Sequence, residues 1–346
     1  LLKALPVSVL ARMTELMNDV LEDPSTIPQG WKTSRVTLIP KKDEPAPLDY
    51  RPITLLSCVA KVLERILWRR IQRCHAPMHF NQGGFVEERG CAEQAWRLRM
   101  TSELWQQDAT EGVGLFLDVK KAYDTAPVAT VMRRVLEQFG TPAVDDDGAG
   151  NGARVGGVPH YIVQYCWHWC RGHTRLLAME GEGGRALTVE RGCPQGSVLS
   201  PWLFNCFLNP LVAELSSARF TSQLPGVEGK AGEVNAYAYA DDLAVALTRA
   251  SGPMLQEMVD VCVRWARANG MQFAPSKCVL LKLGMVKRRP AWRLRARMSG
   301  EALAVVQVFK YLGIEFWSTH RQVLNRDSAF AEARRFLRGP AKPQDC

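Results

Sequence analysis

The chain has 346 residues, of which 47% are hydrophobic and 23% charged, and it carries a formal net charge of +9. This length exceeds what one hydrophobic core usually organises, so we expect two or three subdomains. The positive charge favours a polyanionic partner, and no apolar run reaches the ~18 residues that a membrane-spanning helix needs, which excludes a helical membrane protein.

The cysteines indicate a reducing compartment. All ten lack the spacing of a disulfide framework, which favours free thiols in an intracellular protein. One group lies too close together for the paired ligands of a zinc finger or knuckle: Cys166, His168, Cys170 and His173. The chain starts without Met and stops abruptly at Cys346, so we expect a fragment of a longer protein.

Helical and extended patterns alternate in the N-terminal part. Apolar residues recur at helical spacing from Leu5 to Leu21, whereas Arg35–Pro40 and Arg51–Leu56 are typical of strands on either side of a proline-broken loop. A second helix is predicted at Cys58–Cys74. Its predicted core-facing residues are Val62, Leu63, Ile66 and Leu67. Its cationic face, either solvated or bound to template phosphates, carries Arg65, Arg69 and Arg73.

Two acidic sites combine apolar strands with carboxylates. In AYAYADDLAVAL, apolar residues recur at period two on both sides of Asp241 and Asp242, which predicts two short strands joined by a tight turn. The apolar run GLFL before Asp118 predicts a buried strand that ends in a third carboxylate.

These carboxylates need a cation, because an unpaired buried charge costs several kcal/mol, comparable with the stability of a domain. Hard divalent cations prefer oxygen ligands, and two ions about 4 Å apart activate a 3′-hydroxyl and steady the departing pyrophosphate. Asp118 together with Asp241 and Asp242 is the minimum set of ligands for such a site.

Three segments occur in an order that resembles a known family. FLDVKKAYDT, RGCPQGSVLSPWLF and YADD resemble the central palm motifs of reverse transcriptases, most closely those of non-LTR (LINE-like) retrotransposons. Among the flanking segments, WKTSRVTLIPKKDEPAPLDYRPITLLS resembles the fingers motif and NQGGFVEERGCAEQ the motif that follows it. Within the latter, QGGFVEERG resembles the template-facing loop. GMQFAPSKC resembles the lysine-bearing motif, and FKYLGIEF the primer-gripping hairpin.

The resemblance implies an α+β right-hand polymerase. Fingers would occupy residues 1–110, and a palm with an antiparallel sheet residues 111–300. A primer-grip hairpin and the start of a truncated thumb would occupy 301–346. The Gly- and Asp-rich stretch at 141–159 has no periodicity, which predicts a flexible surface insertion.

The resemblance also implies roles for individual residues. Asp118 and Asp241 would bridge two Mg²⁺ ions, with Mn²⁺ as an alternative, and Asp242 would bind metal or support the site. Lys41 and Arg51 would contact the incoming triphosphate by charge pairing. Tyr123 would lie beneath the sugar and exclude a ribose 2′-hydroxyl, unless its ring only packs.

Further implied contacts lie in the second half of the chain. Pro194, Gln195 and Gly196 would line the pocket for the nucleotide and template base. Lys277 would protonate the departing pyrophosphate as a general acid. Asp124 is expected to cap a helix or form a salt bridge, and the basic run Lys287–Arg297 either grips a nucleic-acid backbone or is solvated.

The predicted reaction is template-directed addition of deoxynucleotides to a primer 3′ end. The implied partners are an RNA template, a DNA primer and deoxynucleoside triphosphates, in an intracellular protein that is nuclear at least in part. Three alternatives stay open: a decayed or truncated element copy that only binds nucleic acid, a group II intron maturase, and a viral RNA-dependent RNA polymerase. The last usually has GDD in place of YADD and no aromatic residue at the Tyr123 position.

Overall fold

The computed structural model describes residues 4–40, 50–74, 78–140, 157–177, 185–217, 233–248, 252–284 and 294–318. Lys41, most of the insertion predicted at 141–159 and most of the basic run Lys287–Arg297 lie outside these ranges, as does the predicted start of a thumb beyond Ser318. For Arg51 the backbone alone is described. No helix in the described part of the chain has the length and apolar character needed to span a membrane.

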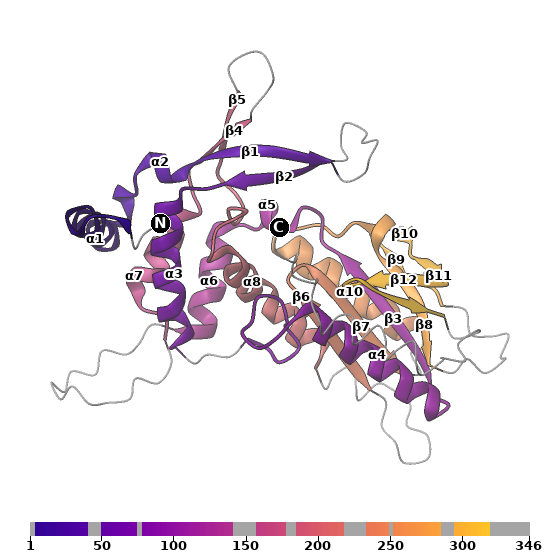
Figure 1. Cartoon of the computed structure of the whole chain (residues 1–346). Coiled ribbons are helices and arrows are strands. Elements are labelled where there is room, and N and C mark those ends of the chain that lie inside the picture. The colour runs from indigo at the N-terminus through magenta and orange to yellow at the C-terminus, as the bar shows by residue number, and fades with distance from the viewer. Residues whose placement is uncertain are drawn as a thin grey trace, which may run out of the picture. The chain divides into compact units, whose positions relative to one another are not determined.

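The chain forms two compact units, each built from segments that are distant in the sequence (Figure 1). Unit 1 consists of Leu1–Phe80, Val119–Leu211 and Trp265–Gln272. Unit 2 consists of Asn81–Asp118, Val212–Arg264 and Phe273–Cys346. Helices α8 (Ser200–Leu215) and α10 (Gly252–Ala268) contribute residues to both.

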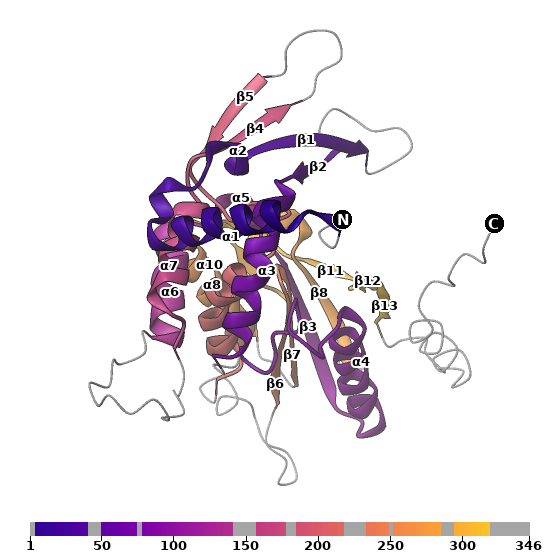
Figure 2. The same cartoon turned by 60° about the vertical axis from the view of Figure 1, so that its left-hand side comes forward.

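Unit 1 combines helices with a four-stranded sheet (Figure 2). Its helices are α1 (Val7–Glu22), η2 (Pro24–Thr26), α2 (Gln29–Lys32), α3 (Cys58–Gln72), α5 (Ala122–Thr125), α6 (Val128–Phe139) and α7 (His160–Trp169). Its strands, in sheet order, are β2 (Tyr50–Leu55), β1 (Thr33–Pro40), β4 (His173–Leu177) and β5 (Arg185–Val189). Neighbouring strands are antiparallel except β1 and β4, which are parallel. The two strands predicted around the proline-broken loop therefore pair with each other.

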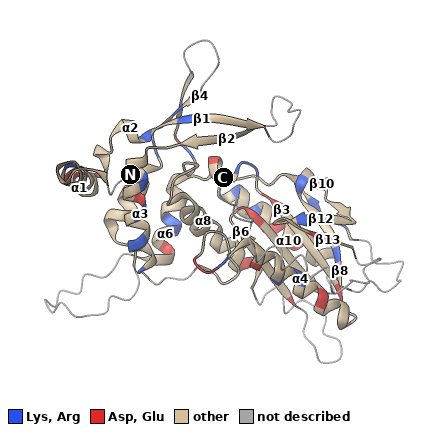
Figure 3. Ribbon diagram, viewed as in Figure 1, with Lys and Arg blue, Asp and Glu red and all other residues tan. Residues whose placement is uncertain are grey.

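Helix α3 buries Leu63 and Leu67 as predicted, but the rest of its buried stripe differs from the prediction. Its buried residues are Ala60, Leu63, Glu64, Leu67 and Ile71. The prediction for Ile66 was wrong, because this side chain is 40% exposed. With 3.6 residues per turn, positions 60, 64, 67 and 71 share one stripe, so Glu64 enters the core and Ile66 falls beside it. Figure 3 shows basic residues on α3, where the predicted cationic residues Arg65 and Arg69 are exposed.

Unit 2 is built on a five-stranded sheet. Its strands, in sheet order, are β11 (Ala304–Val306), β8 (Val279–Gly284), β3 (Glu111–Asp118), β7 (Asp242–Thr248) and β6 (Val234–Tyr239). The pairs β8–β3, β3–β7 and β7–β6 are antiparallel, and β11 is parallel to β8. The remaining elements are α4 (Cys91–Gln107), η3 (Pro275–Lys277), the pair β9 (Arg297–Met298) and β10 (Glu301–Ala302), and the hairpin of β12 (Val308–Tyr311) and β13 (Ile314–Trp317).

Both faces of this sheet are buried. One face packs against α4 and the β12–β13 hairpin, in a core that includes Leu98, Trp105, Phe116, Tyr311 and Phe316. Gly112 makes room for α4, since a Cβ there would lie 2.2 Å from the Trp105 ring. The alternate residues Leu115, Val245 and Leu280 are 0% exposed. Strands buried on two sides carry continuous apolar runs, and the acidic residues Asp118 and Asp242 stand at strand ends.

Candidate active site

The hairpin that carries the paired aspartates has the predicted form. β6 and β7 pair with Tyr239 opposite Asp242, so that Ala240 and Asp241 alone make the connecting loop. Ala240 has a φ of +54°, which is left-handed and costs roughly 1–2 kcal/mol for a residue with a Cβ. Two-residue loops use positive φ because it matches the twist of the strands. Asp241 therefore lies in the turn and Asp242 begins β7.

Asp118 reaches the same sheet edge from the neighbouring strand. In the antiparallel register of β3 and β7, Asp118 lies directly opposite Asp242. Opposite residues project from the same face, with their Cβ atoms about 5 Å apart. The three carboxylates that the sequence placed in one site thus come from adjacent strand ends.

Partial desolvation and repulsion between carboxylates perturb the pKa values of Asp241 and Asp242. The pKa of Asp242 is raised to about 6, first because the protein excludes water from the carboxyl and then because Asp241 and Asp118 repel its charge. The pKa of Asp241 is also raised, mainly by burial, while its own backbone N–H lowers it and Asp118 raises it. A site that disfavours its own negative charges in this way favours a bound cation.

Lys277 supplies one positive charge. Its Nζ lies 3.3 Å from Asp118 Oδ2, and its side chain is 69% exposed. The short helix η3 presents this lysine, and the backbone N–H of Ala274 donates to the Asp118 carbonyl (2.9 Å), which holds the segment beside β3. The structure therefore brings the predicted general acid next to a predicted metal ligand.

A groove adjoins the acidic edge within unit 2. It has a volume of about 600 Å³ and is lined by Asp118, Asp242, Lys277 and the β12–β13 turn around Leu312. Tyr311 Oη donates to the Tyr237 backbone carbonyl (3.1 Å), which fastens the hairpin to β6. The predicted primer-gripping hairpin therefore lines the same groove as the carboxylates of Asp118 and Asp242.

The donor set of this edge fits a hard divalent ion. Within the described residues no three or more His, Cys, Asp or Glu side chains already surround one point as in a preformed metal site. However, Asp118, Asp241 and Asp242 supply oxygen donors, and the pKa values of Asp241 and Asp242 are raised first by burial and then by repulsion from neighbouring carboxylates. Carboxylate oxygens are the ligands that Mg²⁺ and Mn²⁺ prefer. These three residues could therefore hold such an ion.

Unit 1 contains the residues predicted to contact the nucleotide. Tyr123, in α5, stacks on Phe204 with ring centroids 4.8 Å apart. Gly192 and Gly196 have φ values of +90° and +87°. A Cβ would lie 2.4 Å from the Tyr123 carbonyl oxygen at Gly192 and 2.7 Å from the Thr54 carbonyl oxygen at Gly196. Only glycine suits these positions, so the loop before α8 follows the backbone of α5 and β2 closely.

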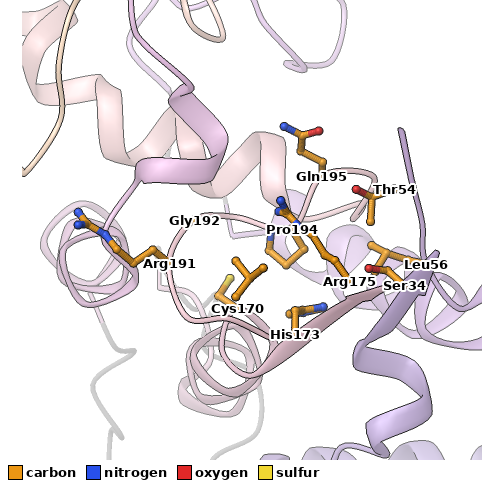
Figure 4. A pocket seen from close by; sticks show the side chains of 11 residues that line it. Ser34, Thr54, Leu56, Cys170, His173, Arg175, Arg191, Gly192, Pro194 and Gln195 are labelled. Carbon is orange, nitrogen blue, oxygen red and sulfur yellow. The ribbon is translucent and has the colours of Figure 1, made fainter. Parts of the chain in front are cut away.

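One carboxylate connects this loop to the sheet of unit 1. Asp124 Oδ1 accepts from Arg175 Nη2 (2.9 Å), and its Oδ2 accepts from Gln195 Nε2 (3.2 Å). The salt bridge predicted for Asp124 is confirmed. Figure 4 shows Gln195, Arg175 and Thr54 gathered with Pro194 around a small pocket. Because Asp124 accepts a hydrogen bond from Gln195 Nε2, the orientation of the Gln195 amide is set. Gln195 Oε1 can then accept a hydrogen bond from another group.

A buried glutamate supports the same loop and was missed in the sequence. Glu64 is 0% exposed; it accepts from the Ser197 hydroxyl and from the Val198 backbone N–H (3.0 Å). Burial raises the pKa of Glu64 to about 7, although these hydrogen bonds lower it. The sequence signal for it was its helical spacing with the apolar residues Ala60, Leu67 and Ile71. That spacing does not show which groups would satisfy the carboxyl, because its partners lie outside α3.

Replacing Glu64 by Gln is expected to remove a pH dependence of stability. The pKa of Glu64 in the folded chain is about 7, above the ordinary 4.5, so the folded state binds this proton more tightly. The free energy of unfolding of the wild type should therefore fall by about 3 kcal/mol relative to that of the variant as the pH rises from about 4.5 to 7. Above pH 7 the difference between the two proteins should stay constant. Denaturant unfolding of both proteins at roughly pH 5 and pH 8 measures the difference. Glu15→Gln, on the surface of α1, is the control, and an equal wild-type-to-variant difference at both pH values contradicts the assignment.

The chain is similar to known proteins in both sequence and fold. A family model described as "Reverse transcriptase (RNA-dependent DNA polymerase)" matches residues 39–316. Among solved structures, an apo telomerase from Candida tropicalis, truncated from its C-terminal domain, has a similar fold. That match has a TM-score of 0.51 at 12% identity and covers 85% of this chain and 54% of the other. The predicted α+β polymerase fold is thus confirmed.

Curated relatives come from retrotransposable elements. The putative 115 kDa protein of type-1 element R1DM of Drosophila melanogaster is 28% identical over 83% of this chain and 25% of its own length. A Pol polyprotein of a type-1 element R2 of Popillia japonica is 29% identical over 83% of this chain and 38% of its own length. The RNA-directed DNA polymerase from the Drosophila mobile element jockey is 25% identical over 95% of this chain and 34% of its own length.

The chain thus spans between a quarter and two-fifths of these relatives. The family match extends over more than half of this chain and includes both the acidic edge of unit 2 and the glycine-rich loop of unit 1. The chain belongs to the reverse transcriptase (RNA-dependent DNA polymerase) family, with relatives in non-LTR retrotransposons.

Proposed function

We propose that this chain catalyses RNA-templated transfer of deoxynucleotides to a primer 3′ end. Reverse transcriptases act on a template, a primer and deoxynucleoside triphosphates, and they generally use divalent metal ions. The observation that carries the proposal is the register of β3, β6 and β7, which brings Asp118, Asp241 and Asp242 to one edge of the sheet. Asp118 and Asp242 line the groove there.

Asp118 and Asp241, with Asp242 as a further ligand or support, would hold two Mg²⁺ ions or, alternatively, Mn²⁺. Bound there, these ions would lower the pKa of the primer 3′-hydroxyl and neutralise charge on the phosphates. Lys277 Nζ, 3.3 Å from Asp118, would donate a proton to the departing pyrophosphate oxygen. Positioning and charge neutralisation account for most of the catalysis in phosphoryl transfer.

The residues of unit 1 would select the nucleotide. The Tyr123 ring would exclude a ribose 2′-hydroxyl, and Pro194, Gln195 and Gly196 would bind the base pair that forms. Lys41 and Arg51 would pair with the triphosphate. In this assignment residues 1–110 act as fingers, 111–300 as palm, and 301–346 as primer grip and the start of a thumb. We further propose that the enzyme is intracellular and nuclear at least in part.

Primer extension tests the proposal. A DNA primer annealed to an RNA template should be extended to the template end with magnesium and deoxynucleotides, and chelation of the metal should stop it. Salt should weaken template binding, because phosphate contacts release counterions. A folded wild-type chain that binds primer and template without extending the primer would instead favour the decayed-copy alternative.

A further inference from the structure

A short segment of unit 2 runs beside the strand that leads to the catalytic turn. The backbone N–H of Ala238 donates to the Asn81 carbonyl (2.9 Å), and that of Gly83 donates to the Ala238 carbonyl (2.8 Å). These bonds form an isolated parallel bridge between Gln82 and Ala238. The segment thus extends the sheet beyond its edge strand β6.

The Gln82 side chain reaches from this bridge to the turn itself. Gln82 is 0% exposed, and its Oε1 accepts from the backbone N–H groups of Gly84 (3.0 Å) and Ala240 (3.1 Å). Ala240 directly precedes Asp241 and has a φ of +54°. One amide oxygen therefore binds the strained residue of a two-residue loop that carries a candidate metal ligand.

Gly84, two residues after Gln82, also packs closely against the turn at Ala240. A Cβ at Gly84 would lie 2.3 Å from the Ala240 nitrogen and 3.1 Å from its Cα. A side chain there would push the turn away, so the close approach of the two backbones requires glycine. The loop from Asn81 to Gly84 is therefore fitted to the turn along its backbone as well as through one side chain.

We propose that Gln82 is a positioning residue for catalysis, which holds the Ala240–Asp241 turn so that the Asp241 carboxylate keeps its place beside the strand ends that carry Asp118 and Asp242. It acts through the backbone of Ala240 and touches no substrate. The inference rests on the proposed polymerase function. It adds to that function a supporting residue, Gln82, which lies in the segment beside β6. Small displacements matter in such sites, because a shift of about 1 Å lowers a rate by roughly 10²-fold.

The chain offers a matched control. Gln94, in α4 of the same unit, is also 0% exposed, and neither atom of its amide has a hydrogen-bond partner among the described residues. It lies against the same segment, since a Cβ on Gly83 would be 2.3 Å from Gln94 Cγ. Gln94→Met therefore makes the same chemical change beside the segment without removing an acceptor from the turn.

Hydrogen–deuterium exchange tests the contact without requiring activity. In the wild type the Ala240 amide should be protected despite lying in a turn, and fast exchange there would overturn the proposal even if no variant folded. Gln82→Met should speed its exchange at least ~10-fold because the buried N–H loses its acceptor. Gln82→Glu, which keeps Oε1, should retain protection, and Gln94→Met should leave it unchanged. Equal loss of protection in Gln82→Met and Gln94→Met would show general loosening and refute the proposal.

Primer extension then tests the catalytic consequence. Gln82→Met should lower kcat about 10²-fold with the Kd for primer–template unchanged, while Gln94→Met retains wild-type kcat. A weakened primer–template Kd with kcat intact would mean that Gln82 binds template, and would overturn the positioning role. Were the wild type itself unable to extend primers, the proposed function would fail, while the exchange result would still decide the contact.

Discussion

Asp241→Asn is expected to abolish primer extension, lowering kcat at least ~10³-fold. The change removes one negative charge from a site whose other members, Asp118 and Asp242, cannot alone neutralise two divalent ions. Losing several kcal/mol of transition-state stabilisation corresponds to a fall of this size. Single-turnover extension of a DNA primer on an RNA template measures the effect.

The same variant should keep its fold and its affinity for nucleic acid. Asn matches Asp in shape, and the pKa of Asp241 is already raised by burial, so removing its charge relieves desolvation and repulsion. Asp108→Asn, at the exposed end of α4, is the control for loss of one acidic charge. Retention of extension within about tenfold of wild type would rule out Asp241 as a metal ligand.

Tyr123→Ala is expected to relax sugar selection, raising incorporation of ribonucleotides relative to deoxynucleotides by roughly 10²-fold. Removing the ring opens space for a 2′-hydroxyl, and exclusion by shape alone accounts for discrimination of about this size. Competing the two nucleotide types in single-nucleotide extension gives the ratio of kcat/KM values.

Tyr123→Phe is the matched control, because it keeps the ring stacked on Phe204 and removes only the hydroxyl. It should preserve the wild-type ratio. If Tyr123→Ala lowers thermal stability but leaves the nucleotide ratio unchanged, the ring serves only packing, which is the alternative that the sequence left open.

Local patterns predicted much of the fold. The alternation around Asp241 and Asp242 identified the β6–β7 hairpin, and the run GLFL identified β3, since strands buried on both faces must be apolar along their length. The helix predicted at Cys58–Cys74 matches α3 (Cys58–Gln72). FKYLGIEF forms the β12–β13 hairpin, whose turn residues Leu312 and Gly313 both have positive φ. Each of these elements follows from spacing within about a dozen residues.

Helix phase was the weaker part of the prediction. Ile66 was assigned to the core by its apolarity, but the stripe of α3 that packs inward contains Glu64. A carboxyl is tolerated there because the Ser197 hydroxyl and the Val198 N–H bind it. These partners lie far along the chain, so the sequence of α3 alone could not reveal that a charged residue would be satisfied in the core.

The sequence by itself determined the chemistry of this protein: three carboxylates at apolar strand ends, a glycine-rich loop before an apolar helix, and the order of motifs that places it among reverse transcriptases. Residue type and short-range spacing carry that information. The tertiary structure alone decided which distant groups meet: Asp118 opposite Asp242, Lys277 beside Asp118, Asp124 between Arg175 and Gln195, and Gln82 on the Ala240 turn. These contacts join residues separated by tens to more than a hundred positions, and strand register and packing fix them, neither of which is encoded in any one segment.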